Sequence, residues 1–302
     1  MGRVTDTLNG ITSYGEDGLI QLYELFHSIK DFEIPIVRYT IFPGSSLIRQ
    51  RINKKGKNFT SVSELSYPPP SSTPMERANL PGNPLFYACS FPSEINEEAP
   101  IPRLISLEET SAFMKDKLNY GIERATVSKW SVIYQLELIA LPFLGTYERA
   151  CPDLKKMKEG WEDAVTKGII PPDALELVTY MAQEISREFK DRHMYFKIAN
   201  FVNYLLRMNE KTKDADGILY PSVPAQGAGF NVAIKPEVAD MKIQFSNASI
   251  CHCVKRGDKM TIFTVSDAFS DEFGSLSYKD RDISREEAKF YRENSQGLLL
   301  VN

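Results

Sequence analysis

Residues 76–90, ERANLPGNPLFYACS, place an arginine, an asparagine and a tyrosine around a Pro-Gly turn that leads into a short apolar run. A Pro-Gly pair is a strong turn signal. The run PLFYAC that follows it is typical of a short strand. This stretch predicts a polar site built from a loop and the strand that the loop enters.

A second strand is expected upstream, at residues 47–52, LIRQRI. Alternate side chains of a strand share a face, which places Leu47, Arg49 and Arg51 on one side and Ile48, Gln50 and Ile52 on the other. Two arginines on one face predict either a wet cavity that holds an anion or a face in bulk solvent. Residues 66–74, SYPPPSSTP, lack the N–H donors of a helix or central strand. We expect them to form a rigid loop that frames the site.

The chain has 302 residues, 42% of them hydrophobic, enough for one large domain or two small ones with a substantial core. The net charge is -4 with both signs interspersed, which argues against a nucleic-acid partner or an anionic membrane surface. No run approaches the roughly 20 apolar residues of a membrane span, and no secretory signal is apparent. A cytoplasmic protein is predicted.

The four cysteines, Cys89, Cys151, Cys251 and Cys253, are too few and too irregularly spaced for a disulfide framework. Cys251 and Cys253 would share one face of a strand, but two thiolates are only half of a zinc site. The three histidines are scattered. We therefore expect reduced, structural cysteines and no metal.

The hydrophobic period changes along the chain from strand-like to helical and back. Residues 130–140 alternate as one strand, residues 152–211 have a period near 3.6, and closely spaced strands return over residues 217–265. Ser284 followed by Glu287 forms a capping box that begins a last helix. This order favours an α+β fold with largely antiparallel sheets.

Several common catalytic motifs are missing from the sequence. It contains no GxxxxGK[ST] and no GxGxxG, which argues against a P-loop or a classical dinucleotide-binding fingerprint. It also contains no HExxH and no GxSxG, which argues against a zinc protease or an α/β-hydrolase.

Three segments taken in order resemble the RES domain family, named for an arginine, a glutamate and a serine: LIRQR, RANLPGNPLFYACS and GILYPSVPAQGAGFNVAIKP. The likeness covers about residues 45–245. The family's positions are occupied here by Arg49, Arg77, Asn79, Gly82, Tyr87, a glutamate of the LEET segment, Ser222, Asn231 and Pro236. The Gly-Gly that usually precedes the second arginine is replaced by Met75 and Glu76.

The resemblance implies a fold similar to that of ADP-ribosyltransferase toxins. It implies a single RES-like domain over residues 1–302, with an N-terminal helix (about 1–40), a helical insertion (about 152–211) and a C-terminal strand and helix extension (about 246–302). It further implies an NAD-consuming enzyme of a toxin or defence type that cleaves the nicotinamide–ribose bond by hydrolysis or phosphorolysis. ADP-ribosyl transfer to a protein is one alternative, and a non-catalytic nucleotide- or protein-binding module is another. An antitoxin or inhibitory protein is the implied partner, and homo-oligomerisation is left open.

Cleavage of the nicotinamide–ribose bond passes through an oxocarbenium-like state, so the site needs an anion near the developing positive charge and a grip on the pyrophosphate. A guanidinium binds phosphate bidentately, and a tyrosine can stack on nicotinamide or hold its ribose. The residues expected to bind NAD are Arg49, Arg77, Asn79, Tyr87, Ser222 and Asn231. Those expected to act in catalysis are Arg49, Tyr87, Ser222 and Glu108.

Glu108 and Glu109 both fit the glutamate of the family. Glu108 is preferred because it directly follows the apolar Leu107, as the family's glutamate does. Both lie in the first turns of a helix predicted over residues 105–114, where the helix dipole favours negative charge without any substrate. Purely structural roles are open for the other residues too: Arg77 and Asn79 can close a turn, Tyr87 can belong to the core, and Ser222 can cap a bend.

Overall fold

A computed structural model describes residues 2–29, 37–54, 57–90, 102–141, 150–187 and 191–301. Within these residues, eleven strands form one sheet. The strands are β1 (Val37–Ile41), β2 (Ser46–Ile52), β3 (Phe86–Ser90), β4 (Tyr120–Val132), β5 (Leu136–Ala140), β6 (Gly217–Pro221), β7 (Phe230–Ile234), β8 (Ile243–Arg256), β9 (Lys259–Ser270), β10 (Leu276–Asp280) and β11 (Leu300–Val301).

The helices lie mainly in the first and middle parts of the chain. They are α1 (Arg3–Gly10), α2 (Glu16–Ser28), α3 (Val62–Leu65), α4 (Pro102–Thr110), α5 (Ala112–Lys115), α6 (Pro152–Thr166), α7 (Pro172–Ile185), α8 (Phe196–Asn203), α9 (Pro236–Lys242) and α10 (Arg285–Ser295). Two 3-10 turns, η2 (Pro70–Ser72) and η3 (Arg192–Tyr195), and one π-helical turn, η4 (Tyr204–Met208), accompany them.

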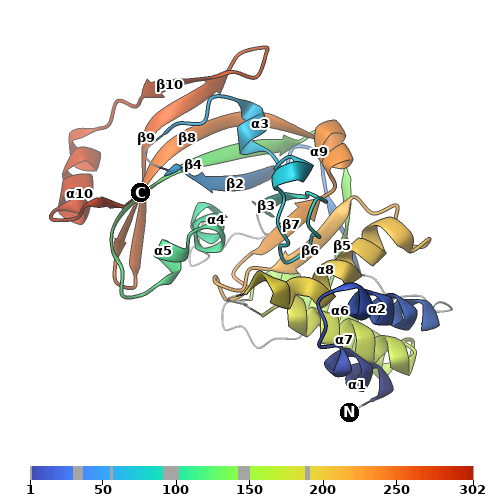
Figure 1. Ribbon diagram of the computed structural model, residues 1–302. Coiled ribbons are helices and arrows are strands. Elements are labelled where there is room, and N and C mark those ends of the chain that lie inside the picture. The colour runs from blue at the N-terminus through green and yellow to red at the C-terminus, as the bar shows by residue number, and fades with distance from the viewer. Residues whose placement is uncertain are drawn as a thin grey trace.

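The sheet is open and mostly antiparallel, with the strand order β1-β5-β6-β7-β3-β2-β4-β8-β9-β10. The two parallel pairs are β5 with β6 and β4 with β11. Helices gather near the β5–β6 side, while β8, β9 and β10 curve away toward α10 (Figure 1). A mixed α+β fold is therefore confirmed.

The prediction of a single strand over residues 130–140 is wrong. β4 ends at Val132, and β5 begins at Leu136. The amides of Ile133 and Tyr134 donate to the carbonyl of Lys242, which turns the chain out of the ladder. A tertiary contact therefore divides a pattern that reads as continuous in the sequence.

Two apolar cores cover opposite faces of the sheet. On β7, Ala233 belongs to the core beneath α1, α2, α7 and α8, whereas its neighbours Val232 and Ile234 belong to the core on the other face. This alternation is expected of a central strand. Helices α7 and α8 therefore form a packed layer against one face of the sheet, with α1 packed on α7, whereas α6 contributes Leu154 and Met157 to the core on the other face.

The sequence expectations for the ends of the chain have mixed outcomes. The N-terminal region contains two helices, α1 and α2, where one was expected, and residues 30–36 lie outside the described part. At the other end, Ser284 and Glu287 form the predicted capping box of α10. The C-terminal strands are part of the main sheet, because β8 pairs with β4 from Tyr120 to Val132.

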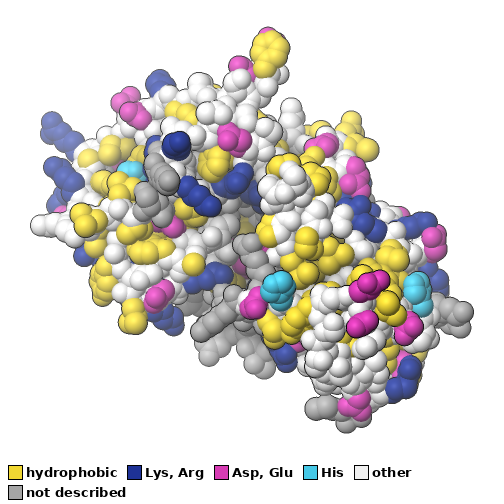
Figure 2. Space-filling view, in the orientation of Figure 1, with side chains coloured by type: hydrophobic (Ala, Val, Ile, Leu, Met, Phe, Trp, Pro, Cys, Tyr) yellow, Lys and Arg dark blue, Asp and Glu magenta, His cyan; other side chains and the backbone are white. Residues whose placement is uncertain are grey.

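Charged side chains of both signs are mixed on the surface, as the sequence predicts. Lys and Arg side chains are interspersed with Asp and Glu over the face shown in Figure 2. Among the described residues, no helix has the length and apolar character needed to cross a membrane. All four cysteines are free thiols in buried positions, as expected.

Candidate functional site

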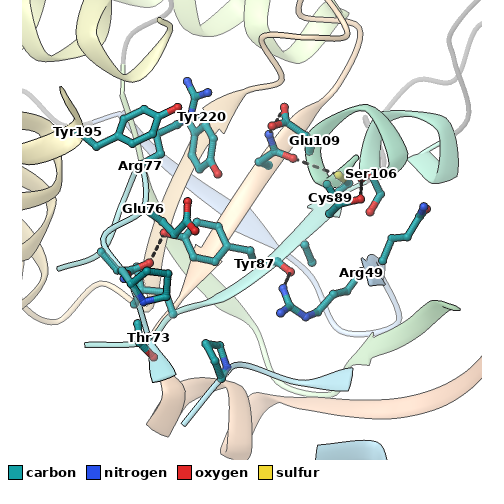
Figure 3. Close-up of a pocket in the computed structure, with 18 of the residues that line it drawn as sticks. Arg49, Thr73, Glu76, Arg77, Tyr87, Cys89, Ser106, Glu109, Tyr195 and Tyr220 are labelled. Atoms are coloured by element: carbon teal, nitrogen blue, oxygen red, sulfur yellow. Dashed lines mark hydrogen bonds between the residues drawn. The ribbon is translucent and has the colours of Figure 1, made fainter. Parts of the chain in front are cut away.

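A cavity of about 410 Å³ lies where α4, the proline-rich loop and the centre of the sheet meet. Its volume is within the range of ~300–1,000 Å³ typical of small-molecule sites. The proline-rich loop contributes Pro68, Thr73 and Pro74, which confirms that this loop frames the cavity. Figure 3 shows Arg77 with Tyr195 and Tyr220 on one side, and Glu109 with Ser106 and Cys89 on the other.

The turn before β3 is held by backbone and amide hydrogen bonds. The Glu76 amide donates to the Asn79 carbonyl at 3.1 Å, and Gly82 has a left-handed backbone with φ +76 that glycine adopts at little cost. Asn79 Nδ2 donates to the carbonyls of Pro74 and Leu80 at 2.9 and 3.0 Å. The structural role considered for Asn79, closing a turn, is therefore present, although Asn79 also lines the cavity.

Tyr87 projects from β3 into the cavity wall. Its hydroxyl donates to Asn79 Oδ1 at 2.7 Å and accepts from the Ala78 amide at 3.2 Å. Burial, reinforced by the charge of Glu76, raises the pKa of Tyr87 above its ordinary value. The phenol therefore stays neutral and offers the cavity a ring rather than a base.

Glu109 is the carboxylate at the centre of the polar network. Ser222 Oγ donates to Glu109 Oε1 at 2.6 Å, and Asn231 Nδ2 donates to the same oxygen at 2.8 Å. Behind them, the Cys89 thiol donates to Asn231 Oδ1 at 3.1 Å. Charge-assisted bonds of this kind fix the orientation of a carboxylate. Oε2 receives no hydrogen bond from the described residues, so it is the oxygen that a ligand could contact.

The structure places Glu109, and not the preferred Glu108, in the cavity wall. One step along a helix turns a side chain by about 100°, so two adjacent glutamates cannot face the same way. Glu108 instead lies where its charge acts on Lys255 of β8. Of these two glutamates it is therefore Glu109 that lines the cavity, and the position of Glu108 does not support the role predicted for it.

Ser222 lies behind the cavity rather than in its wall. Its side chain is fully buried and does not line the cavity, whereas Asn231 does. Ser222 therefore acts on Glu109 and not directly on a ligand. Burial also raises the pKa of the Cys89 thiol, so this cysteine is a neutral hydrogen-bond donor and not a nucleophile.

Arg49 and Arg51 share a face of β2 as predicted, and Arg49 lines the cavity, but both guanidinium groups donate to backbone carbonyls. Arg49 donates to the carbonyls of Leu65 and Tyr87 at 3.0 and 2.6 Å, and Arg51 donates to the Glu64 carbonyl. Both guanidinium groups thus bind the last carbonyls of α3 or the backbone of β3. Burial, with the nearby charge of Arg51, lowers the pKa of Arg49 to about 10, so it is still a cation at neutral pH.

Arg77 is buried between the turn and the helical layer. Its Nη1 donates to the carbonyls of Ile185 and Arg187, at the end of α7. The guanidinium carbon lies 5.4 Å from the ring centroid of Tyr195 and 6.0 Å from that of Tyr220. Arg77 thus borders the cavity while it holds the helical layer against the turn.

Sequence reasoning left several polar or aromatic residues of the cavity without a role, among them Gln50, Lys115, Tyr195 and Tyr220. Gln50 had a usable signal, because it lies between Ile48 and Ile52 on the apolar face of its strand. Tyr220 directly precedes the Pro-Ser of the third RES-like segment. Tyr195 comes from the helical layer, more than a hundred residues from the turn, and no local pattern connects it to the cavity.

Among the described residues, no group of three or more His, Cys, Asp or Glu side chains could hold a metal ion. Comparison with protein-family models and with curated proteins finds no match for this chain. The chemistry of the cavity therefore follows from its own residues. These are the fixed carboxylate of Glu109, the neutral Tyr87, two further tyrosines beside Arg77, and cations in the wall.

Proposed function

We propose that this protein cleaves the nicotinamide–ribose bond of NAD in the cavity beneath α4, with Glu109 as the catalytic carboxylate. The observation that carries the proposal is the orientation of Glu109 by Ser222 and Asn231 at 2.6 and 2.8 Å. A carboxylate fixed before the reaction stabilises a cation that forms beside it without reorganisation. The resemblance to the RES family, and with it an ADP-ribosyltransferase-like sheet, is part of the same proposal.

In the proposed reaction the bond between the ribose C1′ and the pyridinium nitrogen breaks, and its electron pair goes to the nitrogen. Nicotinamide leaves as a neutral molecule, and positive charge develops on the ribose. Oε2 of Glu109 would face this charge or accept a hydrogen bond from a ribose hydroxyl. Water then adds at C1′ and loses a proton, which gives ADP-ribose; with inorganic phosphate the product is ADP-ribose 1″-phosphate.

The aromatic and cationic walls would hold the rest of the substrate. Tyr87 presents a neutral ring to the cavity, and Tyr195 and Tyr220 lie beside the Arg77 guanidinium. Arg49 is a cation at neutral pH, and the hydrogen bonds of both Arg49 and Arg77 reach backbone carbonyls. We therefore assign them to the potential of the cavity rather than to a bidentate phosphate clamp.

The test is release of nicotinamide from NAD by the purified protein, followed by chromatography with and without phosphate. Glu109→Gln keeps an acceptor oxygen for Ser222 and Asn231 but removes the charge, so turnover should fall roughly 100-fold, equivalent to ~3 kcal/mol. Glu108→Gln is the matched control on the same helix and should retain turnover.

Two outcomes would reject this assignment. The first is that no nicotinamide is released under either condition and no labelled protein acceptor appears. The second is that Glu108→Gln abolishes turnover while Glu109→Gln retains it. If NAD binds without being consumed, the protein is a nucleotide-binding module instead. If a labelled protein accumulates in place of ADP-ribose, the acceptor is a protein side chain, and cleavage at the same bond still stands.

A further inference from the structure

Gln50 is a buried amide in the wall of the cavity with no hydrogen-bond partner among the described residues. Its side chain is 2% exposed, and both Nε2 and Oε1 lack a partner. It projects from β2 on the face opposite Arg49, beneath α4, which packs across β2. Cys89, Ser106 and Glu109 line the same cavity.

Burial of the Gln50 amide without hydrogen bonds makes folding less favourable. A buried amide without hydrogen bonds loses its interactions with water and gains nothing in return. Most buried polar groups in proteins are satisfied, so an exception calls for a reason. The face of β2 on which Gln50 lies also carries Ile48, which packs with Leu107 in an apolar core. An apolar residue at position 50 would suit that surface better if packing were the only demand.

We propose that Gln50 recognises the carboxamide of the nicotinamide group, and that it makes the site specific for a ligand that offers one donor and one acceptor side by side. This inference rests on the proposed function and identifies the residue that binds nicotinamide, the leaving group. Gln50 Nε2 would donate to the carboxamide oxygen, and the carboxamide N–H would donate to Gln50 Oε1. Two hydrogen bonds would then satisfy both unpaired atoms at once.

The position of Gln50 agrees with the geometry of the reaction. Glu109 lies on α4 and Gln50 on β2, the strand against which α4 packs, and both residues line the same cavity. The pyridine ring carries its carboxamide close to the nitrogen that leaves ribose, so the two groups of the ligand require adjacent partners in the protein. No hydrogen bond from a described residue fixes the Gln50 amide, so it can turn toward the ligand without breaking one.

The same amide would reject close analogues of nicotinamide. 3-Acetylpyridine has the same shape and no charge, but a methyl group replaces the amide nitrogen and leaves Gln50 Oε1 unpaired. Nicotinate has two acceptor oxygens, one of which would face Gln50 Oε1. Because the negative charge of nicotinate is also repelled by Glu109, 3-acetylpyridine is the cleaner probe of Gln50.

The experiment compares the affinities of nicotinamide and 3-acetylpyridine for the purified full chain by isothermal calorimetry. The wild type should bind nicotinamide about tenfold more tightly, the effect of one additional hydrogen bond. In Gln50→Leu the two ligands should bind equally, because the pairing amide is gone. Gln244→Leu makes the same change at an exposed strand position outside the cavity and should keep the preference.

Stability provides a second readout that does not depend on any ligand. Gln50→Leu replaces two unpaired polar atoms with apolar ones of similar size, so its midpoint of thermal unfolding should equal or exceed that of the wild type. At the same concentration, nicotinamide should raise the midpoint of the wild type more than that of Gln50→Leu. A strongly destabilised Gln50→Leu would mean that the amide holds the fold, and would overturn the inference.

The outcomes separate this inference from the proposed function. Equal binding of the two ligands by the wild type, no binding of either at millimolar concentration, or a preference retained in Gln50→Leu would overturn the role of Gln50, even if NAD is consumed. If nicotinamide binds through Gln50 but NAD is not cleaved, carboxamide recognition stands and the catalytic proposal fails.

Discussion

Replacement of Arg77 tests whether this residue holds the helical layer to the cavity wall. Its guanidinium donates to the carbonyls of Ile185 and Arg187, where α7 ends. The last carbonyls of a helix lack intrahelical partners and carry partial negative charge. Ile185 is the last residue of α7 and Arg187 lies just beyond it, so the buried Arg77 cation satisfies one such carbonyl and a second after the helix, more than a hundred positions along the chain.

The expected loss in Arg77→Met follows from these contacts. Methionine keeps most of the apolar stem but removes two charge-assisted hydrogen bonds, each contributing at least ~1.5 kcal/mol. The loss of the cation beside Tyr195 and Tyr220 removes about another 1 kcal/mol. The free energy of unfolding should therefore fall by about 4 kcal/mol. Arg77→Lys keeps the charge but not the planar fork, so it should lose about half as much.

Urea denaturation followed by tryptophan fluorescence and circular dichroism measures the difference, and thermal unfolding should show a shift of roughly 8 °C. Arg3→Met is the matched control, because Arg3 pairs with Asp173 in the first turn of the same α7, in an exposed position. An exposed pair of this kind contributes at most ~1 kcal/mol. If Arg77→Met loses no more stability than Arg3→Met, Arg77 does not anchor the helical layer.

Two other perturbations act on different parts of the fold. Glu109→Ala leaves the buried Ser222 hydroxyl and the Asn231 amide without an acceptor, so the free energy of unfolding measured in urea should fall by about 3 kcal/mol. Glu109→Gln keeps an acceptor and should lose ~1 kcal/mol or less. Equal losses in the two variants would show that the network adds nothing to stability. Burial, and then the charge of Arg124, lower the pKa of His252 below its ordinary value of 6.5. His252 is therefore protonated more readily in the unfolded chain than in the folded one. The stability that this difference contributes is present above pH 6.5 and is lost as the pH falls below 6.5. The thermal midpoint of the wild type should drop more between pH 7.5 and pH 5.5 than that of His252→Gln, and parallel pH profiles would contradict this.

Local sequence patterns predicted the features that depend on neighbouring residues. The capping box at Ser284 and the alternation of LIRQRI both appear in the structure, because each needs only side chains a few positions apart. The division between β4 and β5 was missed, since the carbonyl that turns the chain belongs to Lys242, more than a hundred residues later. Boundaries set by tertiary contacts leave no local signal.

The same reasoning explains which parts of the site were predicted. Residues near the turn were nominated from sequence order, and five of them line the cavity: Arg49, Arg77, Asn79, Tyr87 and Asn231. The choice between two adjacent glutamates depended on the rotational phase of α4, which a helical pattern sets only when its apolar face is unambiguous. The partners of Arg77 are backbone carbonyls at the end of α7, and no motif in the sequence indicated that the guanidinium would bind them.

These contacts distinguish the residues that support the cavity walls from the polar groups that are open to a ligand. Arg49 and Arg77 bind backbone carbonyls from α3, β3 and the end of α7, so they hold the walls in place. Glu109 Oε2 and the Gln50 amide have no hydrogen bonds from the described residues, so their polar capacity is left for a ligand. Substitution of either arginine should therefore reduce stability and ligand affinity together. Glu109→Gln and Gln50→Leu should change turnover or binding while the fold persists, and this contrast separates the groups that build the site from the groups that use it.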